Sequence, residues 1–450
     1  PWVPRLCKCD SAVLPSARCR RDHMSFRMIE GPLQSVLRFL WPYPKFKTTL
    51  PGPHACVASL IRTRLDEKTC VATISYPAQE TSTPAHHQPY WSPEAVEGLA
   101  DYIGASGAVK ALLSPLHRQW HPSPVGLLPA ERSSGAGATR WPLIIFSHGL
   151  AGCADMYTDL CRSLASFGYI VIALEHEDGS GVHATRISDG HVIRYKRPDS
   201  TPYSREKVTT FRAGFLQHRV SEISSILRAL HAAAAEDGEE RSAGGAGGAG
   251  EQLRAVLRAA DVEQVALVGH SFGAAGVYAA AKELGVQYHF RLAALLDPWA
   301  FALPDAALHD TPPVPLVSVL SEAWTCNDEV FAVDSLLDAA NAAARLDGSY
   351  SIKGSVHQSF ADTQCWLPGA LGAKLGMKGR AEVRGSTHAL GQAGCTLHPK
   401  QEPCCSATRA AGGPSSCLGE PRRWPPTSSG PRSTSAARRR SSASTTSTRP

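Results

Sequence analysis

Short apolar runs that alternate with a helical pattern most constrain how this chain can fold. Each run is too short to span a membrane, which takes about 20 apolar residues, but suits a buried strand. Between them, apolar residues in 207–230 recur every three or four positions, as on one face of a helix. Alternating strands and helices predict an α/β fold, with a mostly parallel central sheet covered by helices on both faces. The expected strands are 142–146, 169–174, 264–269, 292–296 and 314–320.

Composition divides the 450 residues into a central domain and two atypical ends. We expect the domain at 53–385, interrupted by a flexible Gly/Ala-rich insertion at 234–250. Residues 1–52 form a Pro/Arg-rich extension, and 386–450 a Ser/Arg-rich tail that is disordered or translated from the wrong frame. Nine basic and two acidic residues lie in that tail, which therefore accounts for the net charge of +6. The near-neutral domain is not expected to bind nucleic acid.

Two features of the sequence bear on its location. The thirteen cysteines lack the two-plus-two spacing of a zinc site, so most are expected to be free thiols. No secretory signal is recognised in the first residues. Either the start of the chain is missing or the protein is cytoplasmic, and we expect a cytoplasmic protein. The sequence does not indicate its oligomeric state.

A peripheral contact with membranes is expected from the extension. Leu33, Val36, Leu37 and Leu40 share one face of a short expected helix, and this face suits either a lipid surface or packing on the domain. Both interpretations stay open.

The stretch "VALVGHSFGAAGVYAAAKE" places Ser271 between an apolar strand and a helix of small residues. The turn from strand to helix must be sharp, and Gly269 and Gly273 leave room for it. The hydroxyl then lies at a helix N-terminus, where free N–H groups and the helix dipole favour negative charge. The pattern predicts a nucleophilic serine, and a chance match of five residues is the alternative.

A nucleophilic serine needs a base, and an acid that orients the base. Asp297 follows the apolar run 292–296, at the sheet edge where the carboxyl ends of parallel strands meet. It can also be a turn residue before Pro298. Asp328, which lies beyond the next expected strand, is a competing acid.

Three histidines lie downstream of the serine within the expected domain. His357 enters a loop after a short strand-like run, whereas His289 and His309 lie in helical or Pro-rich surroundings. His357 is therefore the expected base.

The backbone N–H groups of Leu150 and Phe272 are the expected oxyanion donors. One follows the serine, and the other lies in the loop "SHGLAG" after the expected strand 142–146. His148 precedes the serine in the chain, so we expect it to hold this loop by hydrogen bonding. No metal and no cofactor are expected, since the two donors would do the work of a Lewis acid.

Five segments resemble, in this order, the platelet-activating factor acetylhydrolases, which are calcium-independent phospholipases A2. They are "LIIFSHGLAG", "FGYIVIALEHEDGSG", "VALVGHSFGAAG", "LLDPWAF" and "IKGSVHQSFAD", and "PYWSPEAVEGLADYIG" upstream is also similar. The resemblance covers about 53–385. It implies an α/β-hydrolase fold with Ser271 as nucleophile, Asp297 as acid in preference to Asp328, and His357 as base.

The resemblance also implies an activity. The expected reaction is hydrolysis of the short-chain sn-2 acyl ester of glycerophospholipids such as platelet-activating factor, at a membrane or lipid-particle surface. A general carboxylesterase that acts on small soluble esters, and a catalytically silent hydrolase-like binding protein, are the alternatives.

Overall fold

The computed structural model describes most of residues 46–366. The expected helix at 33–40, Asp328 and the tail at 386–450 lie outside the described residues, so the expectations for them stay predictions. The gaps within the described part are 47–48, 55–57, 80–85, most of 106–118, 135–136, 139, 187–188, 199–203, 237–248 and 327–328.

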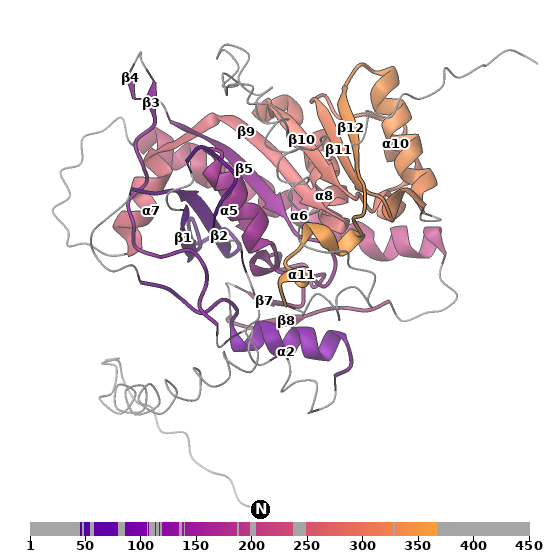
Figure 1. Ribbon diagram of the computed structural model, residues 1–450. Coiled ribbons are helices and arrows are strands. Elements are labelled where there is room, and N and C mark those ends of the chain that lie inside the picture. The colour runs from indigo at the N-terminus through magenta and orange to yellow at the C-terminus, as the bar shows by residue number, and fades with distance from the viewer. Residues whose placement is uncertain are drawn as a thin grey trace, which may run out of the picture.

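An eight-stranded sheet runs through the centre of the domain, in the strand order β1-β2-β6-β5-β9-β10-β11-β12 (Figure 1). Strand β2 is antiparallel to both of its neighbours, and the strands from β6 to β12 are parallel. The predicted mostly parallel sheet is therefore confirmed. The strands are β1 (Ala58–Thr63), β2 (Ala72–Pro77), β5 (Trp141–Ser147), β6 (Ile170–Leu174), β9 (Ala260–His270), β10 (Leu292–Leu296), β11 (Leu316–Ser321) and β12 (Leu346–Ile352).

Helices cover both faces of this sheet, because successive side chains of a strand point to opposite faces. In β5, Leu143 and Ile145 belong to one apolar cluster, and Ile144 and Phe146 to another. Helices α6, α7, α8 and α10 contribute to the first cluster, and α2 and α5 to the second. The helices are α2 (Pro93–Tyr102), α5 (Thr158–Ser166), α6 (Arg205–Glu236), α7 (Ala249–Arg258), α8 (Phe272–Tyr288), α9 (Asp305–Leu308), α10 (Val330–Ala342) and α11 (Thr363–Trp366).

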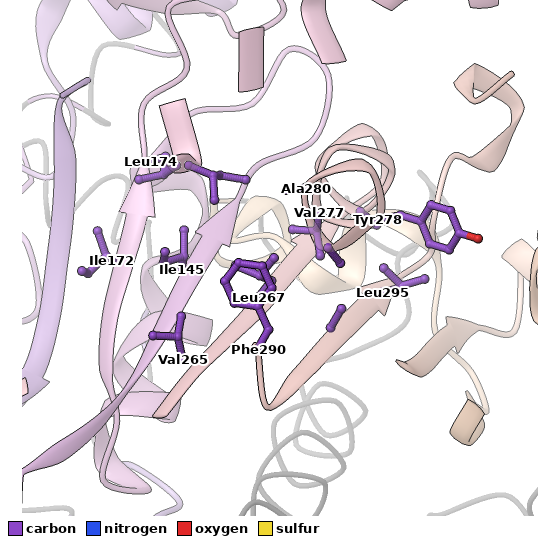
Figure 2. Packing of buried hydrophobic residues seen from close by; sticks show 14 of the residues in the cluster. Ile145, Ile172, Leu174, Val265, Leu267, Val277, Tyr278, Ala280, Phe290 and Leu295 are labelled. Carbon is purple, nitrogen blue, oxygen red and sulfur yellow. The ribbon is translucent and has the colours of Figure 1, made fainter. Parts of the chain in front are cut away.

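The first cluster fixes α8 against the strand that carries Ser271. Figure 2 shows Val277 and Ala280 of α8 above Leu267 of β9 and Leu295 of β10, and all four side chains are buried. Since strand β9 leads directly into α8, this packing holds both sides of the turn at Ser271 in place.

Smaller elements complete the described chain. Two short ribbons pair β3 with β4 and β7 with β8. The bounds are β3 (Ser133–Ser134), β4 (Gly137–Ala138), β7 (His183–Thr185), β8 (Val192–Arg194), and the 3₁₀ helices η1 (Ala154–Tyr157), η2 (Ala300–Ala302), η3 (Trp324–Cys326) and η4 (His357–Phe360). No helix of the described part combines the length and the apolar character that a membrane crossing requires.

The five strands expected from the sequence and the helix expected at 207–230 all occur, as β5, β6, β9, β10, β11 and α6. The insertion expected at 234–250 is helical at its two edges, where α6 ends at Glu236 and α7 begins at Ala249. Parallel strands end at one edge of the sheet, so the residues after β9, β10, β11 and β12 gather there.

Candidate active site

Ser271 occupies the turn between β9 and α8 in a strained backbone conformation, with φ 57° and ψ −121°. A residue with a side chain rarely adopts a positive φ, at a cost of about 1–3 kcal/mol. Four backbone hydrogen bonds oppose this cost. Ser271 N–H donates to the Leu296 carbonyl at 2.9 Å, and the Ser271 carbonyl accepts from the N–H groups of Trp299, Ala274 and Ala275 at 3.0, 3.1 and 3.3 Å. The fold therefore holds the hydroxyl at a fixed place above the sheet.

We call the turn at Ser271 the elbow. Its two glycines, Gly269 and Gly273, are required because other backbone atoms lie close to them. A Cβ atom on Gly269 would lie 2.3 Å from the Gly273 carbonyl oxygen, and one on Gly273 would lie 2.1 Å from the Ser147 carbonyl oxygen. Neither glycine has a positive φ, so the room for the sharp turn comes from the missing side chains.

Asp297 and His357 form a hydrogen-bonded pair beside this turn. The Asp297 carboxylate is fully buried, and its Oδ2 accepts from His357 Nδ1 at 3.1 Å. Ser321 donates its N–H to Oδ1 and its hydroxyl to Oδ2, both at 2.6 Å. Three donors therefore point at the carboxylate and fix its orientation.

The imidazole ring of His357 lies between two other rings. Trp324 stacks on it with the ring centres 4.2 Å apart and the planes at 17°, and His270 lies at 4.5 Å. The His270 ring thus joins His357 to the elbow, since His270 precedes Ser271. In the described part of the chain, Ser271 makes no hydrogen bond to His357; such bonds often form only when substrate is bound.

The expected oxyanion donors lie next to the serine. A Cβ atom on Gly149 would lie 3.1 Å from the Ser271 Cβ, which places the loop that carries Leu150 against the serine. Neither Leu150 N–H nor Phe272 N–H has an acceptor among the described residues. Tyr157 holds the loop, because its hydroxyl accepts from Gly149 N–H at 3.1 Å and bonds to the His270 ring at 2.8 Å.

A buried guanidinium supports the loop from below. Arg219 of α6 is fully buried, donates to the His148 carbonyl at 2.6 Å and pairs with Asp178 at 2.9 Å. A further nitrogen donates to the Ser180 hydroxyl at 2.6 Å. The Arg219 guanidinium carbon also lies 4.7 Å from the ring centre of Phe272, so one side chain contacts both segments that carry the expected oxyanion donors.

His148 holds the loop by hydrogen bonds from both ring nitrogens. Its Nδ1 donates to the Gly149 carbonyl at 2.8 Å, and its Nε2 accepts from His176 N–H at 3.4 Å. Burial, together with the Arg219 charge, lowers the pKa of His148 to about 3. A ring that stays neutral and fully bonded is suited to holding the loop.

This neutral, buried histidine predicts a pH dependence of stability. In the unfolded chain His148 is protonated below pH 6.5, whereas in the folded protein it is protonated only below about pH 3. Because the unfolded state binds the proton more readily, the contribution of His148 to the unfolding free energy falls as the pH falls. His148→Gln, which keeps a donor and an acceptor, is expected to weaken this loss by up to about 1.4 kcal/mol per pH unit. Urea unfolding at pH 7 and pH 5 measures it.

The exposed His191 provides the matched control for that measurement. The wild type is expected to lose a certain amount of unfolding free energy between pH 7 and pH 5. His191→Gln is expected to leave the size of this loss unchanged. If His148→Gln also leaves it unchanged, the buried ring does not act as described.

One group of described residues has the donor types of a metal site. His270, Asp297 and His357 each offer a ligand atom, and these atoms lie within 4.8 Å of one another. The two Asp297 oxygens already accept three hydrogen bonds, and His357 Nδ1 supplies one of them. The arrangement fits an acid that orients a base better than it fits a metal ligand set.

A family model described as platelet-activating factor acetylhydrolase, isoform II, matches residues 42–396. The chain belongs to this family. The resemblance seen in the sequence is therefore confirmed, and with it the α/β-hydrolase fold. The domain boundaries expected at 53–385 stay a prediction.

Several relatives carry the family's name. A platelet-activating factor acetylhydrolase of Cavia porcellus is 27% identical over 342 residues, 74% of this chain and 74% of that protein. That of Canis lupus familiaris is 28% identical over 295 residues, 64% of this chain and 62% of that protein. The match thus spans less than two thirds of the second relative. Among solved structures, a ferulic acid esterase from Streptomyces cinnamoneus superposes with a TM-score of 0.46 at 18% identity, over 76% of this chain and 87% of that chain.

The site of this acetylhydrolase-family chain includes residues that the sequence did not indicate. Ser321 was identifiable in principle, because it ends the strand next to the one before Asp297 and so lies at the same sheet edge. Trp324, Tyr157 and Arg219 had no signal beyond being aromatic or basic residues in apolar surroundings. Their roles depend on how distant elements pack.

Proposed function

We propose that this chain is a serine esterase that hydrolyses the sn-2 ester of glycerophospholipids with a short or oxidised acyl chain, such as platelet-activating factor. Ser271 would be the nucleophile, His357 the base and Asp297 the acid. The observation that carries the proposal is the Asp297–His357 hydrogen bond of 3.1 Å beside a strained serine, in a member of this family.

In the first half of the reaction, Ser271 Oγ would attack the ester carbonyl carbon while His357 Nε2 takes the hydroxyl proton. Asp297 holds Nδ1 protonated, which leaves Nε2 free to accept. The carbonyl oxygen gains negative charge and is met by the N–H groups of Leu150 and Phe272. When the ester bond breaks, the proton passes from His357 to the departing glyceryl oxygen, and lysophospholipid leaves.

In the second half, water would attack the acyl-serine carbonyl carbon and give a proton to His357. The bond from the carbonyl carbon to Ser271 Oγ then breaks, and the proton returns to Oγ as the short carboxylic acid leaves. The donors and the base are the same in both halves, so no further group is needed to complete the cycle.

The substrate class rests on the family. The relatives of Cavia porcellus and Canis lupus familiaris are named for platelet-activating factor, whose sn-2 ester carries an acetyl group. A phospholipid substrate would be drawn from a membrane or a lipid particle, and Phe331, which is 50% exposed, offers an apolar contact near the site through Phe301 and Trp299.

The test compares three substrates at equal concentration: a 2-acetyl phospholipid, the matching 2-palmitoyl phospholipid and a small soluble ester. We expect kcat/KM for the acetyl phospholipid to exceed that for the other two by about tenfold or more, with and without a calcium chelator. Equal or better hydrolysis of the soluble ester would favour a general carboxylesterase. No turnover of any ester, with no labelling by a fluorophosphonate, would favour a catalytically silent binding protein.

A further inference from the structure

A second buried guanidinium, that of Arg212, lies beside Phe272. Arg212 precedes Arg219 by two turns of α6, and only 3% of it is exposed. Its guanidinium carbon lies 4.7 Å from the ring centre of Phe211, 5.0 Å from Phe215 and 5.8 Å from Phe272. The ring of Tyr195 lies at 5.4 Å. Arg212 is therefore enclosed by four aromatic rings, and one of them belongs to an expected oxyanion residue.

The hydrogen bonds of Arg212 are incomplete. Nη2 donates to the Tyr195 hydroxyl at 2.8 Å, whereas Nη1 is buried and has no acceptor within the described part of the chain. Burial lowers the pKa of Arg212, but a guanidinium stays protonated at neutral pH. A buried charged donor without an acceptor is costly, so its persistence in the fold needs a reason.

Arg219, on the same helix, is a buried guanidinium whose N–H groups have hydrogen-bond acceptors. It pairs with Asp178 and donates to Ser180 and to a backbone carbonyl. Asp178 also acts on Arg212 electrostatically, but its oxygens are occupied by Arg219 and Ser180. One of the two positive charges beside Phe272 is neutralised by a carboxylate bonded to it, and the other is not.

Packing alone does not account for Arg212. Aromatic rings stabilise a cation through its flat faces, by about 0.5–2 kcal/mol. Apart from the Tyr195 hydroxyl, they offer no acceptor to the N–H groups in the guanidinium plane, and these groups match the oxygens of a phosphate or a carboxylate. An oxyanion in the guanidinium plane would supply the acceptor that Nη1 lacks among the described residues.

We propose that Arg212 is the anion subsite for the ester substrate, and that its free nitrogen binds the phosphodiester of a glycerophospholipid whose sn-2 carbonyl lies at Ser271. The inference rests on the proposed function. Phe272 links the two places, since its N–H serves the carbonyl and its ring contacts the guanidinium. Only a short run of bonds separates the sn-2 ester from the phosphate at sn-3, in keeping with subsites on either side of one residue. A carboxylate at the end of an oxidised acyl chain has the same chemistry.

The test is a change of selectivity in Arg212→Met, which keeps the volume and removes the charge. Substrates are a 2-acetyl phospholipid below its micelle concentration and the neutral 2-acetyl glyceride that lacks the phosphate. We expect kcat/KM for the phospholipid to fall by at least about tenfold more than for the glyceride. Arg212→Lys is expected to keep part of the selectivity, because it keeps the charge.

Arg197→Met is the matched control, because Arg197 is exposed and its guanidinium carbon lies 5.7 Å from the same Tyr195 ring. It is expected to leave both rates unchanged. A third substrate, a neutral glyceride with a 2-glutaryl chain, identifies the source of the anion. Arg212→Met could lower kcat/KM for this glutaryl substrate selectively and leave kcat/KM for the phospholipid unchanged. In that case the subsite binds the acyl carboxylate, and the phosphodiester assignment is wrong.

Equal losses on the charged and neutral substrates, with a lower melting temperature, would show that Arg212 is a structural cation and would overturn the proposal. A phospholipid rate unaffected by Arg212→Met, with the glutaryl glyceride equally unaffected, would overturn it as well. If the wild type hydrolyses the glyceride but no phospholipid, the proposed function fails by itself. Inorganic phosphate then tests the subsite: it should inhibit glyceride hydrolysis by the wild type and not by Arg212→Met.

Discussion

Replacing Ser271 by alanine is expected to lower kcat/KM for the 2-acetyl phospholipid by about 10⁴-fold or more, without unfolding the protein. The side chain occupies a position set by the backbone, so its loss removes the nucleophile and leaves the elbow intact. His357→Ala is expected to cause a similar loss, because nucleophile and base act as a unit. Initial rates, with circular dichroism to verify folding, measure both effects.

Ser335→Ala is the control for this pair, since it makes the same chemical change at a half-buried position on α10. A fluorophosphonate is expected to label the wild type and the Ser335 variant but not the Ser271 variant. Either residue would be removed from the mechanism if its alanine variant kept more than about a tenth of the wild-type rate, a barrier change of only about 1.4 kcal/mol.

Asp297→Asn is expected to lower kcat/KM by about 10⁴-fold. Ser321 N–H points at one oxygen, and the Ser321 hydroxyl and His357 Nδ1 point at the other. An amide can accept on one side only, so its NH₂ group must face a donor. If it faces His357, the imidazole must carry its proton on Nε2 and can no longer accept the serine proton.

Asp328→Asn, at the competing acid of the sequence argument, provides the comparison and is expected to keep most of the activity. Rates of both variants on the same substrate decide between the two carboxylates. A greater loss at Asp328 than at Asp297 would contradict the assignment of the acid.

The strands that the sequence predicted are those whose apolar residues are continuous. The first two strands escaped prediction because they mix polar and apolar residues although most of β1 and all of β2 are buried; Thr73, for example, bonds to Asp155 across 82 positions of the chain. Strand β12 was indicated only as a short strand-like run before His357, because it lies at the sheet edge, where one neighbour and partial exposure permit residues such as Asp347 and Gly348. Apolar patterning cannot report contacts of these kinds.

The site residues that could be predicted are likewise those that a local sequence pattern indicates. Ser271 and its glycines are contiguous, so their pattern indicated a turn that the structure does contain. Asp297 and His357 could be proposed because both follow strands, and parallel strands end at one edge. Ser321 could have been placed at the same sheet edge, because it ends the strand next to β10. Trp324 could not be assigned from sequence, since its stacking on His357 depends on how distant segments pack.

The elbow glycines also bear on how this protein could be engineered. Positions 269 and 273 admit no side chain, because a Cβ atom there would overlap a backbone carbonyl. Libraries aimed at a new ester range therefore gain nothing by randomising them, and every variant they yield carries a folding defect that masks any change in chemistry. Diversity belongs at side chains near the serine that keep exposed surface, with Trp299, which is partly exposed, and Phe331, which is 50% exposed, as first choices.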